Sequence, residues 1–74
     1  MEQNELYVKI GQMKSDELRK GNQPKNIYLG HETFSRLMRD TEPYLIDYNH
    51  DQHRYSVIDL LIYRVDEKEH LVLA

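Results

Sequence analysis

The chain contains no cysteine, and this absence narrows the ways in which 74 residues can hold a fold together. A domain of this length buries only roughly 60% of the surface that its unfolded chain exposes, so its margin of stability is thin. Disulfides and thiolate zinc sites, which often support small domains, are excluded. We therefore expect one domain, residues 1–74, supported by close packing, by oligomerisation, or by a site built from histidines and carboxylates.

The charge is mildly acidic and unevenly distributed. Residues 41–74 carry three basic and seven acidic side chains, whereas residues 1–40 carry seven and six. Because binding to a nucleic-acid backbone depends on Lys and Arg, the acidic half argues against a broad nucleic-acid surface. A local contact stays open as an alternative function, through the basic side chains of segment 14–25, which are Lys14, Arg19, Lys20 and Lys25.

Hydrophobicity gives no sign of a membrane protein. No apolar run approaches the roughly 18 residues that a membrane span needs. The first five residues are acidic and polar, whereas a signal peptide begins with a basic region. We expect no membrane association and a cytoplasmic location.

The clearest element is a helix over residues 31–39. Phe34, Leu37 and Met38 have the spacing i, i+3, i+4 and form one narrow apolar face. Acidic residues near the start and basic residues near the end complement the helix dipole. Pro43, shortly beyond the segment, ends it.

Residues 5–12 permit two interpretations. Leu6, Val8 and Ile10 alternate with Tyr7 and a lysine, which is typical of a half-buried strand. The same leucine and isoleucine also fit a helical stripe that continues along the chain. We expect a short strand or an irregular arm here.

Residues 13–20 favour a short helix. Ser15 is a candidate N-cap for it, because a serine hydroxyl can accept a hydrogen bond from a free backbone N–H group. Gly21 is a candidate stop, since glycine readily adopts the left-handed conformation that ends many helices.

The remaining apolar segments predict strands. A short strand covers residues 26–29. Segments 44–48 and 54–58 flank a polar stretch suited to a turn, so we expect them to form a hairpin. Segment 60–65 is the most hydrophobic and is expected in the centre of the sheet, and residues 70–73 form a last strand.

Together these elements predict an α+β fold, with one clear short helix packed on a small, mainly antiparallel sheet and a possible second short helix near the N-terminus. Residues 24–74 form the strand–helix–hairpin–strand core of this arrangement, and residues 1–23 form the less certain N-terminal arm or helix. The side chains expected in the hydrophobic core are Ile27, Leu29, Phe34, Leu37, Met38, Leu45, Val57, Leu60, Ile62, Val65 and Leu71.

Residues 24–30 form a strand that runs directly into a short helix carrying Phe34 and Leu37, and a hairpin and further apolar strands follow. Over residues 24–74 this order resembles small phage and prophage proteins and the axial domain of the bacteriophage-type capsid and encapsulin fold. The long spine helix and the extended loop of those shell proteins have no counterpart here. The resemblance implies an α+β fold, a phage or prophage origin, and a place in a bacterial host cell or with the virion.

His50 and His53, with Asp47 close by, form the one cluster with metal-ligand chemistry. Two imidazoles and a carboxylate could hold zinc or a non-haem metal. Histidine and aspartate are also common in turns, and this segment looks like an exposed hairpin tip. We therefore expect an ordinary turn and no cofactor, and keep a small His/Asp metal site as a further alternative.

No pattern of a catalytic site is found. The serines have no flanking nucleophile motif, and the three glycines are isolated, so no phosphate-binding loop can be assembled from them. We therefore expect no enzyme.

Six tyrosines are the most informative functional feature. Most of them occupy strand positions opposite the expected apolar face. Tyrosine provides large, rigid contact area at protein interfaces, although it is also an ordinary strand former. The residues expected at an interface are Tyr28, Tyr55 and Tyr63, together with Leu71 and Leu73 of the last strand.

The last strand, residues 70–73, ends in three apolar side chains and is suited to pairing by strand addition. We therefore expect a non-enzymatic protein–protein interaction or self-assembly module. Its partner is expected to be another protein or a second copy of the chain, in a homo-oligomer.

Overall fold

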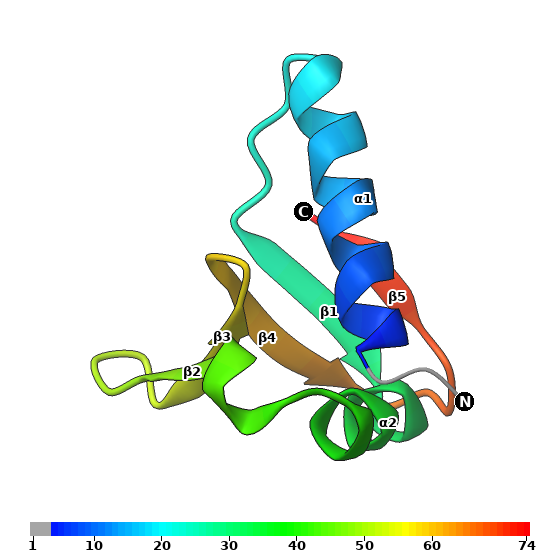
Figure 1. Ribbon diagram of the computed structural model, residues 1–74, viewed down its shortest axis with the longest axis vertical. Helices are drawn as coiled ribbons and strands as arrows, with labels where there is room; N and C mark the ends of the chain where they lie inside the picture. Colours follow the sequence, from blue (N-terminus) through cyan, green and yellow to red (C-terminus); the bar gives the residue numbers. More distant parts are fainter. Residues whose placement is uncertain (1–3) are drawn as a thin grey trace.

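The computed structural model describes residues 4–74, which form two α-helices, a short 3-10 helix and one five-stranded sheet (Figure 1). This arrangement confirms the predicted α+β class. Within these residues no helix is long and apolar enough to cross a membrane. In chain order the elements are α1 (Glu5–Arg19), β1 (Asn26–Gly30), α2 (His31–Asp40), η1 (Pro43–Leu45), β2 (Ile46–Asn49), β3 (Arg54–Val57), β4 (Leu60–Val65) and β5 (Leu71–Leu73).

The strand order across the sheet is β2-β3-β4-β1-β5. Three of the four pairings are antiparallel, and β1 pairs with β4 in parallel. The prediction that segment 60–65 forms the central strand is confirmed, since β4 has two strands on each side. The predicted hairpin also forms, because β2 and β3 pair from Ile46–Val57 to Asn49–Arg54.

The hydrophobic core lies between the two helices and one face of the sheet. Every second residue of the strands points into it, as the alternation of side chains along a strand requires. Helix α2 contributes Leu37 from the apolar face predicted for it. The buried apolar side chains are Leu6, Ile10, Ile27, Leu29, Leu37, Val57, Leu60 and Ile62, with Phe34 and Leu71 packed against them.

Three parts of the predicted core are wrong. Met38 and Leu45 are only half-buried and are not among the core side chains or those packed against them. Val65 is paired with Gly30 and so lies on the opposite face of the sheet from Leu60 and Ile62. Leu6 and Ile10, which were not expected in the core, are buried in it. The N-terminal segment is therefore part of the core and not an arm outside it.

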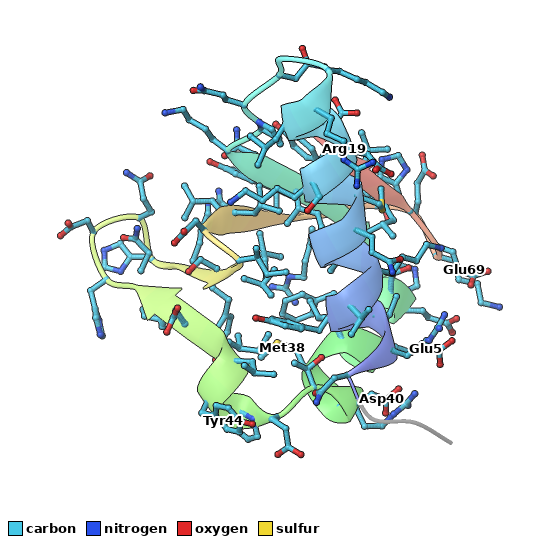
Figure 2. The ribbon with its side chains drawn as sticks, turned by 45° about the horizontal axis from the view of Figure 1, so that its top comes forward. Glu5, Arg19, Met38, Asp40, Tyr44 and Glu69 are labelled. Carbon is cyan, nitrogen blue, oxygen red and sulfur yellow. The ribbon has the colours of Figure 1, made fainter. Side chains whose placement is uncertain are left out.

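Helix α1 corrects the prediction of a strand or arm over residues 5–12. Leu6 and Ile10 lie four residues apart on the face that contacts the sheet, whereas Val8 is 53% exposed on the other side. The strand-like alternation of Leu6, Val8 and Ile10 therefore arises because a solvent-exposed valine lies between two buried residues of a helix. Ser15 is not a cap, because it lies inside this helix, whose two ends are marked by Glu5 and Arg19 in Figure 2.

The end of α1 confirms the role predicted for Gly21, whose φ is 87°. The N–H of Gly21 donates to the carbonyl of Leu18, and the N–H of Asn22 donates to the carbonyl of Glu17. These two bonds satisfy carbonyl groups that would otherwise be free at a helix end. The arrangement is the Schellman motif, and the chain leaves the helix in an extended direction.

The loop between β4 and β5 caps the start of α2, which has no side-chain cap of its own. The N–H groups of His31 and Glu32 donate to the carbonyls of Glu67 and Lys68, at 2.8 and 3.0 Å. The N–H of Gly30 donates to the carbonyl of His70 at 3.0 Å. The loop therefore takes the place of a side-chain cap. Its hydrogen bonds also join β1 and α2 to residues 67–70, which are distant in the sequence.

Candidate interaction surface

Neither helix of residues 4–74 covers the second face of the sheet. None of the side chains that the strands of the described chain present on it is fully buried. Tyr28 of β1 lies directly between Tyr63 of β4 and Val72 of β5. The register of β3 and β4, continued toward the hairpin tip, places Arg54 opposite Tyr63. These four side chains, Arg54, Tyr63, Tyr28 and Val72, form what we call the open-face row.

The members of the open-face row contact one another across the strands. The rings of Tyr28 and Tyr63 are stacked, with centroids 5.4 Å apart and planes inclined by 29°. The guanidinium carbon of Arg54 lies 4.0 Å from the ring centroid of Tyr63. Val72 is 46% exposed at the end of the row. The row combines aromatic, cationic and apolar surface, a combination enriched where proteins bind one another.

The row leads to the free edge of β5. The N–H and carbonyl groups of Ala74 bond to Asn26, and the carbonyl of His70 accepts from Gly30. Because hydrogen-bonded pairs alternate along an antiparallel ladder, the backbone groups of Leu71 and Leu73 point away from β1. Within residues 4–74 no further strand pairs with this edge. It can therefore accept another strand.

Five residues were predicted at an interface. The structure places two of them on the open face of the sheet and three on the helix-covered face. Tyr28 and Tyr63 meet on the open face, as expected from their strand positions. Tyr55 lies on the other face, because it alternates with Ser56 and shares its face with the buried Val57. Leu71 and Leu73 are half-buried on the helix-covered face, although their backbone forms the free edge.

Two residues of the row, Arg54 and Val72, were not predicted. The signal that could have found Arg54 is its position two residues before Ser56 in a strand whose Val57 is expected in the core. Val72 is likewise the residue between two inward-facing leucines. The neighbours of a residue on the adjacent strands depend on the register of those strands. The sequence does not reveal this register.

The basic segment 14–25 makes contacts within the chain. Lys14 Nζ donates to the Ile58 carbonyl at 2.7 Å, Arg19 lies 3.7 Å from Asp16, and Lys20 lies 3.3 Å from Glu17. Lys25 is exposed and forms no ion pair with the described residues. Exposed ion pairs are weak, so these side chains could still exchange their partners for phosphates. The nucleic-acid alternative remains a prediction.

Hydrogen bonds at the end of α1 lower the pKa of Glu17 from its ordinary value. The side-chain amide of Asn22 donates to its carboxylate at 3.0 Å, and Lys20 is its second partner. Both contacts favour the charged form and lower the pKa of Glu17 below 4.5. The carboxylate stabilises the end of α1 and has no partner that would suggest proton transfer.

The candidate metal ligands do not converge. His50 lies against the ring of Tyr48, at 5.0 Å between centroids, and His53 faces a pocket on the helix-covered side. Asp47 is paired with Ser56, on the open face. Among residues 4–74, no group of three or more His, Asp or Glu side chains could hold a metal ion. Residues 50–53 form the turn of the β2–β3 hairpin.

Comparison with protein-family models, with curated proteins and with solved structures gives no match to this chain. The resemblance to phage proteins therefore stays a prediction from the sequence.

Proposed function

We propose that the chain is a non-enzymatic protein-interaction module that pairs with a second copy of itself through the edge of β5 and the adjoining end of the open-face row. The observation that carries the proposal is the position of Val72, at the free edge and on the uncovered face at once. An origin in a phage or prophage, and a location in the cytoplasm of a bacterial host, belong to the same proposal.

The edge of β5 is complementary to itself. If two copies pair antiparallel about Val72, Leu71 of each copy lies opposite Leu73 of the other. Since the backbone groups of both leucines point outward, each of these two pairs can exchange two hydrogen bonds. The two Val72 side chains meet on the open face, beside Tyr28 of each copy.

The small number of contacts in this pairing favours a weak dimer. Four backbone hydrogen bonds contribute about 1 kcal/mol each, and ordering two molecules costs at least about 4 kcal/mol. The apolar contacts of Val72 and the leucines must supply the surplus. We therefore expect a dissociation constant between about 1 μM and 1 mM.

Light scattering across a concentration series tests the proposal, with two variants that differ in where they place a charge. Val72→Lys puts two ammonium groups against each other at the dimer axis, and lysine on an edge strand opposes strand pairing. Val8→Lys is the matched control, because this valine is also about half exposed but lies on α1. We expect the mass of the unchanged chain and of Val8→Lys to rise with concentration, and that of Val72→Lys to stay monomeric.

A monomeric mass for the unchanged chain up to about 1 mM would refute the proposal, as would equal dimerisation of both variants. The nucleic-acid alternative would instead show binding of DNA or RNA that weakens steeply with salt. If the metal alternative holds, zinc raises the melting temperature of the unchanged chain. Zinc then has no such effect on the His50→Ala variant.

A further inference from the structure

A pocket of about 320 Å³ lies on the helix-covered side of the sheet, away from β5. It exists because the two helices do not reach across all five strands. Figure 1 shows the β2–β3 hairpin extending away from both α1 and α2. The uncovered part of the hairpin and the nearby side of α2 enclose the pocket. Its volume is within the range of small-molecule sites.

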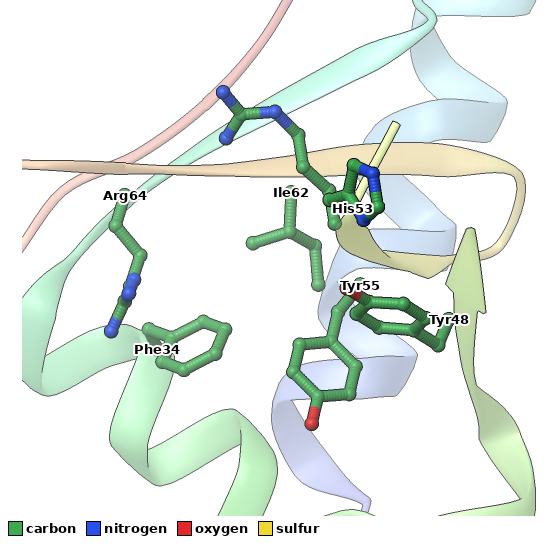
Figure 3. Close-up of a pocket in the computed structure, with 7 residues that line it drawn as sticks. Phe34, Tyr48, His53, Tyr55, Ile62 and Arg64 are labelled. Atoms are coloured by element: carbon green, nitrogen blue, oxygen red, sulfur yellow. The ribbon is translucent and has the colours of Figure 1, made fainter. Parts of the chain in front are cut away.

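Aromatic side chains form the walls of the pocket. Tyr48 and Tyr55 lie next to each other across β2 and β3, with ring centroids 5.2 Å apart in an edge-to-face arrangement. Phe34 of α2 lies 6.4 Å from Tyr55. The close-up in Figure 3 shows Ile62 between Phe34 and these tyrosines. The pocket therefore offers ring faces and edges around an aliphatic floor.

Two arginines, Arg54 and Arg64, line the pocket. The guanidinium of Arg54 lies over Tyr63 on the open face, so Arg64 is the arginine that charges this pocket. Arg64 lines it at the end where Phe34 lies, with its guanidinium carbon 5.0 Å from the ring centroid of Phe34 (Figure 3). Within residues 4–74, Arg64 forms no ion pair, and none of the residues lining the pocket is a carboxylate. Arg64 is also exposed, so its guanidinium is hydrated and can exchange water for an anion.

Arginine in this position favours oxyanions that can accept two hydrogen bonds side by side. Its guanidinium donates two parallel hydrogen bonds to a carboxylate or a phosphate and can stack on an aromatic ring at the same time. Phe34 holds one face of the guanidinium, and its N–H groups lie in the plane of the group, where a ligand can reach them. The pocket thus places an anion-binding group beside ring-binding walls.

We propose that this pocket binds a small aromatic anion, that is, one planar ring bearing a carboxylate or a phosphate. The ring packs against Phe34, Tyr55 and Ile62, and the anionic group bonds to Arg64. The proposal does not rest on the self-pairing proposed above, because no residue of β5 lines the pocket.

Amide NMR spectra of the isotope-labelled chain test the site directly. The probes are benzoate and phenyl phosphate, which differ in the anionic group, with benzyl alcohol as the uncharged aromatic control and inorganic phosphate as the ring-free control. For a fragment of this size we expect a dissociation constant of about 1 mM, with shifts centred on Phe34, Tyr55 and Ile62.

Two arginine variants separate the pocket from general charge effects. Arg64→Gln removes the anion contact, and we expect affinity for the charged probe to fall about tenfold, the usual value of a charge-assisted hydrogen bond. Arg19→Gln is the matched control. Arg19 lies at the end of α1 and does not line the pocket, so the affinity should stay within about twofold. Both side chains are exposed, so both variants are expected to fold.

The binding of the four probes either supports the proposed site or overturns it. Tighter binding of one charged probe than the other identifies the natural anion as a carboxylate or a phosphate. Equal binding of benzyl alcohol, equal loss in the two arginine variants, or shifts that do not saturate would overturn the proposal. Inorganic phosphate alone binding as well as phenyl phosphate would also overturn it, because the ring would then contribute nothing.

Discussion

Replacing Gly30 with alanine would test how closely the loop between β4 and β5 is fitted to the start of α2. Gly30 has a φ of −65°, a value that alanine adopts freely, so the backbone imposes no penalty. Space does. An added Cβ would lie 2.7 Å from the Glu67 carbonyl oxygen and 2.8 Å from the Lys68 carbonyl oxygen and the His70 nitrogen. All three are backbone atoms, so no side-chain rotation relieves the contact.

The loss of stability caused by Gly30→Ala depends on how the chain responds to the added Cβ, and two responses are possible. If the loop moves, it must move away by about 0.6–0.7 Å, the difference between contacts of 2.7–2.8 Å and the 3.4 Å at which ordinary contact begins. That movement lengthens three hydrogen bonds of 2.8 to 3.0 Å, which contribute about 1 kcal/mol each. If the loop stays, the overpacking costs about 1–3 kcal/mol.

Either response costs about 3 kcal/mol at most, and the lower entropy of the unfolded alanine chain offsets up to about 1 kcal/mol. We therefore expect Gly30→Ala to lower the free energy of unfolding by about 2 kcal/mol. For a chain of 74 residues this corresponds to a fall in melting temperature of roughly 8–16 °C. It is a large fraction of the roughly 4–11 kcal/mol that stabilises a chain of this length.

Urea and thermal unfolding followed by circular dichroism measure the effect. Gly11→Ala is the control, because its Cβ would meet only the Ile58 side chain at 3.5 Å, an ordinary contact. Gly11 lies inside α1, where alanine is favoured over glycine by about 0.5–1 kcal/mol. The two substitutions should shift stability in opposite directions. A Gly30→Ala chain as stable as the unchanged one would show that the loop is not held in this position, and the reasoning would fail.

Three further predictions concern the core, the tight turn and the end of α1. Ile10→Ala should lower the free energy of unfolding by about 2–5 kcal/mol in the same assay, because its side chain is 0% exposed; a loss below about 1 kcal/mol would contradict the packing of α1. Asp59→Gly should raise the free energy of unfolding by about 0.5–1 kcal/mol, because Asp59 has a φ of 60° in a two-residue hairpin turn that suits glycine better. A decrease would be inconsistent with this turn. Asn22→Ala should raise the pKa of Glu17 toward 4.5, measured by NMR titration of its carboxyl group. Because the folded pKa is lowered, the carboxylate stabilises α1 above the unfolded pKa, and this contribution is lost as the pH falls through the folded value.

Local patterns predicted the elements whose apolar residues face one way. Helix α2 combines an apolar stripe with a following proline, and the structure places it within one residue of its predicted end. The position of β4 at the centre of the sheet follows from its hydrophobicity, because a central strand is covered on both sides by its neighbours. These signals lie within single segments and need no knowledge of the rest of the chain.

The N-terminal segment shows where such reasoning stops. Leu6, Val8 and Ile10 fit a strand and a helix equally well, and the choice depends on whether Val8 is buried. It is exposed, because α1 lies across the sheet on its Leu6–Ile10 side. That contact is made with strands far along the chain, so nothing within the segment distinguishes the two structures.

The interaction surface was predicted in part for the same reason. Alternation alone correctly places Tyr28 and Tyr63 opposite the core residues of their strands. It could also have assigned Tyr55 to the other face, since Val57 two residues later was expected in the core. The pocket beside Arg64 could not be predicted, because it exists only where α2 and the hairpin leave part of the sheet uncovered.

The position of β1 between β4 and β5 has a consequence for how the chain folds during its synthesis. Strands β2, β3 and β4 follow one another and can pair through short turns as soon as they emerge. Strand β1 precedes them all, yet both of its neighbours come from residues 60–73. Pairs this far apart in sequence form slowly, because a long loop must be closed first. The strand that connects the two halves of the sheet therefore has both edges unpaired until residues 60–73 have been made.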